Sequence, residues 1–127
     1  MIDMDAVNNI FSWATIDPKN PYLELSSYRT ENEKMLFVLD DGSALVVGGG
    51  KSGTIDLPLK KIREQLNQRG KNWSNVVEVV HNHARGERFS SSDYNVNTVL
   101  QKLGFTGKFQ VYNPRIGSVR MLTRKTK

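Results

Sequence analysis

Apolar residues recur at two spacings along the chain, and each spacing predicts one kind of element. Short apolar runs rich in β-branched and aromatic residues predict strands at 35–39, 44–47, 76–80, 108–112 and 118–122. Apolar residues at helical spacing predict three helices, from the sets Val7, Ile10, Phe11 and Ala14, then Leu59, Ile62 and Leu66, then Val96, Val99, Leu100 and Leu103. The order helix, hairpin, helix, strand, helix, hairpin predicts an α+β fold with one mixed sheet flanked by helices.

Turn and cap residues set the expected limits of these elements. The first helix is expected from about Asp3 to Ala14, within an N-terminal segment of residues 1–20, and the segment 22–28 is expected to be extended. The turn 40–43 contains a glycine and predicts a hairpin. Asp56 as a cap and Pro58 in the first turn predict the start of the second helix, and Gly70 predicts its end. Gly104 predicts the end of the third helix.

Length and composition limit the classes of protein. A chain of 127 residues fits one domain, 1–127, with 123–127 as a basic tail. It has no cysteine, so any metal must be bound by His, Asp or Glu. No apolar run approaches the roughly 18 residues of a spanning helix, and the N-terminus does not resemble a signal peptide, so we expect a cytoplasmic protein without a membrane partner. The net charge of +5 is compatible with an acidic partner such as nucleic acid.

The stretch 76–93 holds the residues with the clearest chemistry. In a strand, His81 and His83 would project from one face while Asn82 points away. Ser90 and Asp93 form the pattern Ser-x-x-Asp, which commonly opens a helix. Two imidazole nitrogens and one carboxylate oxygen make a three-ligand zinc set with a fourth position open for water, which is typical of catalytic sites. The alternative is a solvent-facing histidine pair followed by an ordinary helix cap.

Three other patterns carry less weight. The triplet 81–83 spells HNH, but the nucleases of that name take their histidines from separated parts of their fold. The segment 50–52 ends like a phosphate-binding loop, yet Leu45 stands where that motif needs glycine. The serines 90–92 have no Gly-x-Ser-x-Gly elbow around them, so a serine hydrolase is disfavoured.

The pattern His-x-His, loop, Ser-x-x-Asp after an apolar strand resembles the JAMM (MPN/JAB) metallopeptidases, and the RadC-like branch most closely. The similarity covers roughly residues 31–122, because the order of elements after 31–33 also follows that of RadC-like domains. It implies a JAB/MPN-like fold with a cytidine-deaminase-like architecture. The chain departs from the family pattern at Ala84, where proline is usual, and in the loop 84–89, which is one residue shorter than usual.

The resemblance also implies residue roles. His81, His83 and Asp93 match the zinc ligands, and Ser90 matches the serine that hydrogen-bonds the reacting oxygen. Glu33 best matches the general base, with Glu31 as the alternative, because a carboxylate just before an inward-facing strand can reach a metal-bound water.

The function that the resemblance implies is zinc-dependent hydrolysis of a peptide or isopeptide bond. The substrate would be a protein or peptide, with a ubiquitin-like tail as one option. The alternative is a RadC-like nucleic-acid-associated or protein-binding module with weak or no activity. Arg85 and Arg88, in the loop beside the histidines, are candidate contacts for substrate or for a phosphate backbone.

Overall fold

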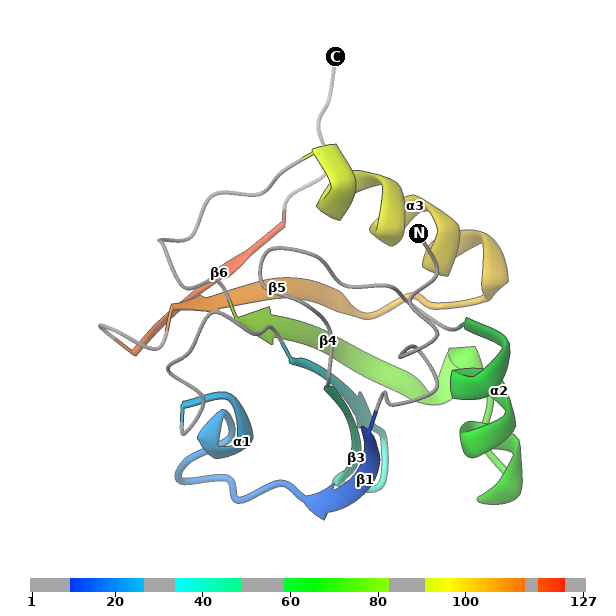
Figure 1. Cartoon of the computed structure of the whole chain (residues 1–127), viewed down its shortest axis with the longest axis horizontal. Coiled ribbons are helices and arrows are strands. Elements are labelled where there is room, and N and C mark those ends of the chain that lie inside the picture. The colour runs from blue at the N-terminus through cyan, green and yellow to red at the C-terminus, as the bar shows by residue number, and fades with distance from the viewer. Residues whose placement is uncertain (1–9, 27–33, 49–58, 83–90, 114–116, 123–127) are drawn as a thin grey trace.

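In the part of the chain that the structure describes, six strands form one mixed sheet at the centre (Figure 1). The computed structural model describes residues 10–26, 34–48, 59–82, 91–113 and 117–122. The strands are β1 (Ile10–Thr15), β2 (Met35–Leu39), β3 (Ser43–Gly48), β4 (Val76–Asn82), β5 (Lys108–Asn113) and β6 (Ser118–Met121). Their order is β1-β3-β2-β4-β5-β6, and the β4–β5 pair is parallel while the other neighbouring pairs are antiparallel. The predicted mixed sheet is therefore confirmed.

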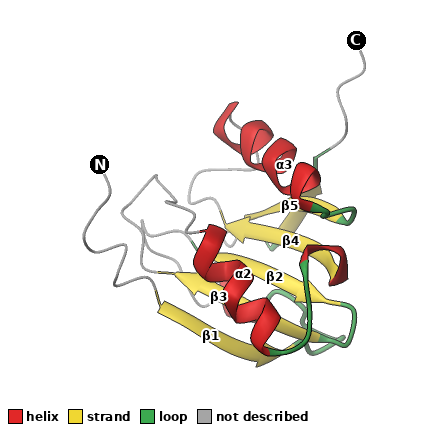
Figure 2. Cartoon of the chain, turned by 90° about the vertical axis from the view of Figure 1, so that its right-hand side faces the viewer, coloured by secondary structure: helices red, strands yellow, loops and turns green. Residues whose placement is uncertain are grey.

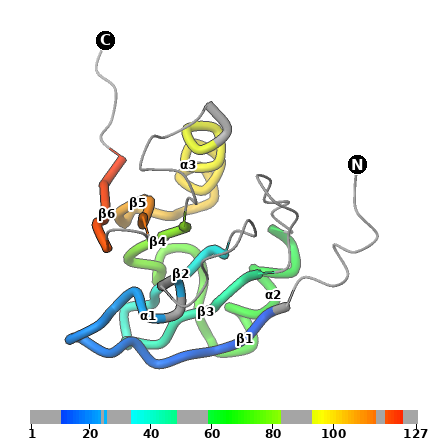
Figure 3. The backbone as a smooth tube through the Cα atoms, turned by 60° about the vertical axis from the view of Figure 1, so that its left-hand side comes forward, coloured from blue at the N-terminus to red at the C-terminus, as the bar shows by residue number. Residues whose placement is uncertain are grey.

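Helices cover both faces of this sheet. Helices α2 (Leu59–Gln68) and α3 (Ser91–Leu103) lie on one face, α2 over the β1 side and α3 over β4 and β5 (Figures 2 and 3). The short helix α1 (Leu23–Ser26) lies on the other face, and the 3₁₀ turn η2 (Trp73–Asn75) precedes β4. Each face has its own buried core. The first core includes Phe37, Leu45, Leu66, Val79, Leu100 and Phe109, and the second includes Leu25, Leu36, Val46, Val80 and Tyr112.

Most of the predicted elements are present. The hairpin β2–β3, the helices α2 and α3, and the strands β4, β5 and β6 occur where the hydrophobic pattern predicts them. The helices end at Gln68 and Leu103, just before the predicted stops at Gly70 and Gly104, which both have positive φ. The expected cap residues 56 and 58 and the basic tail 123–127 lie outside the described residues. Within the described ranges, no helix combines the length and apolar character that a membrane-spanning segment needs.

The prediction of an N-terminal helix is wrong for residues 10–14, which belong to strand β1. Strand β1 pairs with β3 along its whole length, from Ile10 opposite Gly48 to Thr15 opposite Ser43. Phe11 and Trp13 pack against the core under α2, as alternation in a strand requires. Pairing with β3 therefore overrides the helical spacing. The other residues of that expected helix, up to residue 9, lie outside the described part of the chain.

Two smaller expectations also need correction. The segment 22–28 was expected to be extended, but Leu23–Ser26 form helix α1, and Leu25 is fully buried against the sheet. On α3, only part of the predicted apolar set faces the core. Val96 and Leu100 pack inward, whereas Val99 and Leu103 are 41% and 45% exposed. The inward face of α3 is thus centred on positions 93, 96 and 100.

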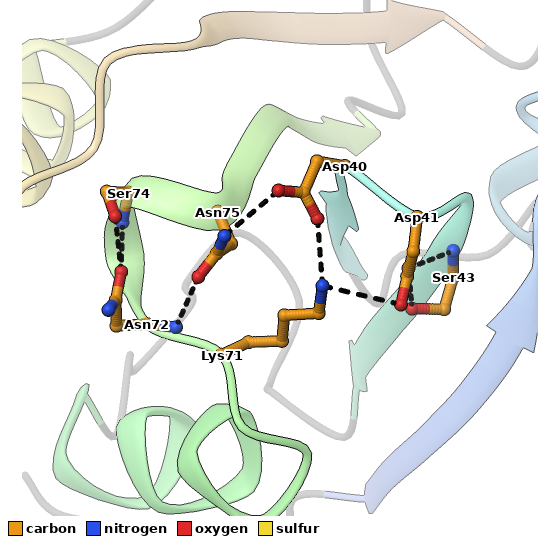
Figure 4. Close-up of polar contacts among 7 residues, drawn as sticks. All are labelled: Asp40, Asp41, Ser43, Lys71, Asn72, Ser74 and Asn75. Carbon is orange, nitrogen blue, oxygen red and sulfur yellow. Dashed lines mark hydrogen bonds and ion pairs between the residues drawn. The ribbon is translucent and has the colours of Figure 1, made fainter.

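A polar network fixes the chain where it enters β4 (Figure 4). Lys71 Nζ lies 3.0 Å from Asp40 Oδ1 and 3.7 Å from Asp41 Oδ2, so it joins the end of α2 to the β2–β3 turn. Asn75 Nδ2 donates a hydrogen bond to Asp40 Oδ2 at 2.9 Å. The hydrogen bond from Asn75, followed by that from Lys71, holds the pKa of Asp40 below its usual value. These exposed contacts hold the start of β4, at the opposite end of the strand from His81.

A second polar cluster attaches α1 to the sheet. The Tyr22 hydroxyl donates a hydrogen bond to Glu78 Oε2 at 2.8 Å, and Gln110 Nε2 donates to both Glu78 Oε2 and the Tyr22 oxygen. Tyr22 also packs against Tyr112, with ring centroids 5.3 Å apart. Partial burial, and then the hydrogen bond to the Glu78 carboxylate, raise the pKa of Tyr22 from 10.0 to about 12.

This cluster predicts a stability change at alkaline pH. Because the pKa of Tyr22 is higher in the folded state, its contribution is complete below pH 10 and is lost as the pH rises towards 12. We expect Tyr22→Phe to lower the free energy of unfolding at pH 7 by about 1 kcal/mol, since one hydrogen bond to a carboxylate disappears. Denaturant titrations should also show that the free energy of unfolding falls less between pH 10 and pH 12 in this variant than in the wild-type protein. Tyr94→Phe on α3 is the control. Equal effects of the two variants would contradict the claim that the hydrogen bond of Tyr22 to Glu78 stabilises the fold.

Candidate metal centre

The candidate site begins at the carboxyl end of β4. His81 lies opposite Met35 of the antiparallel strand β2 and beside Val111 of the parallel strand β5. Its side chain is 1% exposed and packs near Phe109, with ring centroids 5.7 Å apart. Since His81 alternates with Val80, it points to the face covered by α3. The alternative of a solvent-facing histidine is therefore wrong for His81.

Asp93 reaches His81 from the first turn of α3. The distance from His81 Nε2 to Asp93 Oδ1 is 2.9 Å, and Asp93 is 8% exposed. Asp93 lies on the same helical face as Val96 and Leu100, so the packing of α3 on the sheet aims the carboxylate at the strand end. A carboxylate in the first turn is also stabilised by the helix dipole. The structure thus brings together a residue pair that the sequence pattern predicted to converge.

The atoms in contact suit zinc chemically. Imidazole nitrogen and carboxylate oxygen are both common zinc ligands. Two ligand atoms of a tetrahedral zinc site lie about 3.3 Å apart, from bond lengths of about 2.0 Å. The 2.9 Å separation of His81 and Asp93 is a hydrogen-bonding distance, and a change of a few tenths of an ångström would reach the ligand spacing. The pair therefore fits half of a tetrahedral set.

The other predicted site residues cannot be compared with this geometry. His83, Ser90, Glu33, Glu31, Arg85 and Arg88 all lie outside the described residues. Within the described ranges, no group of three or more His, Asp or Glu side chains could hold a metal ion. The complete ligand set and the general base therefore stay predictions.

Asn82 is a residue next to the site whose role the sequence did not reveal. The Lys34 backbone N–H donates a hydrogen bond to Asn82 Oδ1 at 2.7 Å, and the Asn82 N–H donates to the Lys34 carbonyl at 3.3 Å. Asn82 is 1% exposed. These bonds fix Lys34, which directly follows the predicted base, to the end of β4. The only sequence signal was the alternation that points Asn82 away from His81.

The chain was compared with protein-family models, curated proteins and solved structures, and none of the three comparisons found a match. The candidate metal centre is therefore inferred from this chain's own motif and from the His81–Asp93 contact.

Proposed function

We propose that this protein is a zinc-dependent hydrolase that cleaves a peptide or isopeptide bond in a protein or peptide substrate. The observation that carries the proposal is the buried contact of 2.9 Å between His81 and Asp93. It pairs an imidazole at a strand end with a carboxylate at a helix start, as the JAMM-like motif requires. The similarity of that motif to the metallopeptidases supplies the reaction class.

The predicted ligands would be His81, His83 and Asp93. A zinc ion held there would lower the pKa of a bound water to about 7 and so supply a nucleophile at neutral pH. The interior of the site already suits this chemistry, because His81 and Asp93 are almost fully buried and electrostatic interactions are stronger where water is excluded.

Two further side chains would complete the reaction. Glu33 would accept the proton of the attacking water and deliver it to the leaving amine. Ser90 would donate a hydrogen bond to the oxyanion that develops on the substrate carbonyl, a type of contact worth about 3 kcal/mol. If Glu31 is the base instead of Glu33, the Glu31 carboxylate would carry out the same two proton transfers.

The direct test is hydrolysis by the full chain loaded with zinc. The probes are internally quenched peptides and a peptide joined to a lysine side chain through an isopeptide bond. We expect at least one probe to be cleaved, with activity lost in a chelator and restored by zinc. Absence of cleavage by zinc-loaded protein would refute the hydrolase. Salt-sensitive DNA binding that Glu33→Gln does not alter would then favour the nucleic-acid-associated module.

A further inference from the structure

A row of paired residues connects His81 to the edge of the sheet. His81 lies beside Val111 of β5, and Val111 lies opposite Arg120 of β6. Side chains of directly paired residues project from the same face of a sheet, so Arg120 is on the face that carries His81 and α3. Leu122, two residues after Arg120, packs against the core on that face, which agrees with this assignment.

Arg120 is close enough to affect a substrate at the candidate metal centre. Neighbouring strands are about 4.8 Å apart, so two strand spacings place the Cα atoms of His81 and Arg120 about 10 Å apart. Val111 between them is fully buried, whereas Arg120 is exposed. Figure 3 shows α3 above β4 and β5, with β6 as the outer strand beside them.

The charge of Arg120 is not neutralised by an ion pair with another described residue. The ion pairs between described residues join Lys71 to Asp40 and Asp41, and His81 to Asp93. Among the residues that the structure describes, no carboxylate forms an ion pair with Arg120. A guanidinium binds a carboxylate through two parallel hydrogen bonds, which makes arginine well suited to recognise that group.

We propose that Arg120 recognises a carboxylate of the substrate and so determines specificity. This inference rests on the proposed hydrolase function. An extended peptide advances about 3.3 Å per residue, so the carboxylate would lie within about three residues of the scissile bond. The substrate class is thus a peptide or protein tail with an acidic group, an Asp or Glu side chain or a free C-terminus, near the cleaved bond. Arg120 would hold the substrate without taking part in proton transfer.

The test uses matched quenched peptides that carry Glu or Gln at each of three positions on either side of the scissile bond. With zinc-loaded wild-type protein, we expect one Glu peptide to be cleaved with a kcat/KM about tenfold above that of its Gln partner. The difference should lie mainly in KM, because the ion pair exists before and during the reaction. Arg120→Glu should reverse the preference, so that a Lys peptide is cleaved faster than the Glu peptide.

The controls separate this contact from other roles of the residue. A charge on an edge strand can also protect the sheet against pairing with other chains, and Arg120→Lys keeps that protection while losing the planar fork. We expect Arg120→Lys to show a weakened Glu preference. Arg63→Glu changes the same charge on the exposed side of α2 and should leave the preference intact. If Arg120→Glu does not fold, Arg120→Gln serves instead and should cleave the Glu and Gln peptides equally.

The outcomes distinguish this inference from the proposed function. A Glu preference that is undiminished in Arg120→Glu or Arg120→Gln would overturn the inference and leave the hydrolase standing. Equal cleavage of Glu and Gln peptides by the wild-type protein would also overturn the role of Arg120 without refuting the hydrolase. If zinc-loaded protein cleaves none of the peptides, nor the isopeptide probe, the hydrolase itself fails and the role of Arg120 fails with it.

Discussion

Glu33→Gln is expected to lower kcat for peptide hydrolysis by about 10²- to 10⁴-fold while the protein keeps its zinc. The amide is nearly the same size as the carboxylate but cannot accept the proton of the attacking water. Because the predicted zinc ligands are other residues, metal binding should not change. The measurements are single-turnover hydrolysis and metal content on the same preparation.

Glu31→Gln is the matched control, since it makes the same chemical change two residues earlier. We expect it to retain hydrolysis within a few fold of the wild-type rate. If Glu31→Gln abolishes hydrolysis and Glu33→Gln does not, Glu31 is the base. If neither variant slows hydrolysis, neither carboxylate has the proposed role. Glu33 directly precedes Lys34 in the sequence, and the backbone of Lys34 is hydrogen-bonded to Asn82, the residue next to His81.

Gly107→Ala is expected to lower the free energy of unfolding by about 3 kcal/mol or more. A Cβ atom at position 107 would lie 2.1 Å from the carbonyl oxygen of Val77 and 2.4 Å from its carbonyl carbon. Both are backbone atoms of β4, and Gly107 immediately precedes β5, the strand that pairs with β4 in parallel. The clash therefore cannot be relieved by rotating a side chain.

Chemical denaturation monitored by tryptophan fluorescence measures this effect. Gly48→Ala is the control, because the nearest described atoms to a Cβ there belong to the flexible side chain of Lys34, the closest at 3.3 Å. We expect that variant to remain within about 1 kcal/mol of the wild-type protein. A Gly107→Ala protein as stable as the wild type would mean that β4 and β5 do not approach each other as described.

The parts of the fold with strong local signals could be predicted from the sequence. The β2–β3 hairpin has its own turn, and α2 and α3 have glycines just beyond their ends. Strand β1 could not be predicted in this way, because residues 10–15 contain apolar positions that fit both helical and alternating spacing. The choice between them is made by pairing with β3, which is about 30 residues away in the chain.

The polar contacts of the fold and of the candidate site divide in a similar way. The contact of His81 with Asp93 could be predicted because a strand end and a helix cap lie close together in the sequence. The cluster of Tyr22, Glu78 and Gln110 could not, since its members are 32 to 88 residues apart and share no motif. The proposed role of Arg120 could not be predicted from the sequence for a related reason. Its position in the row of His81 depends on the register of three strands, which is a property of the topology.

The most direct test of the metal centre is the zinc content of the full chain, measured by elemental analysis after purification without chelator and after dialysis against zinc. The expected result is about one zinc per chain in the wild-type protein and far less in His81→Ala and Asp93→Ala, with circular dichroism showing that the variants remain folded. A folded wild-type protein that holds no zinc after dialysis would contradict the proposal that His81 and Asp93 are metal ligands.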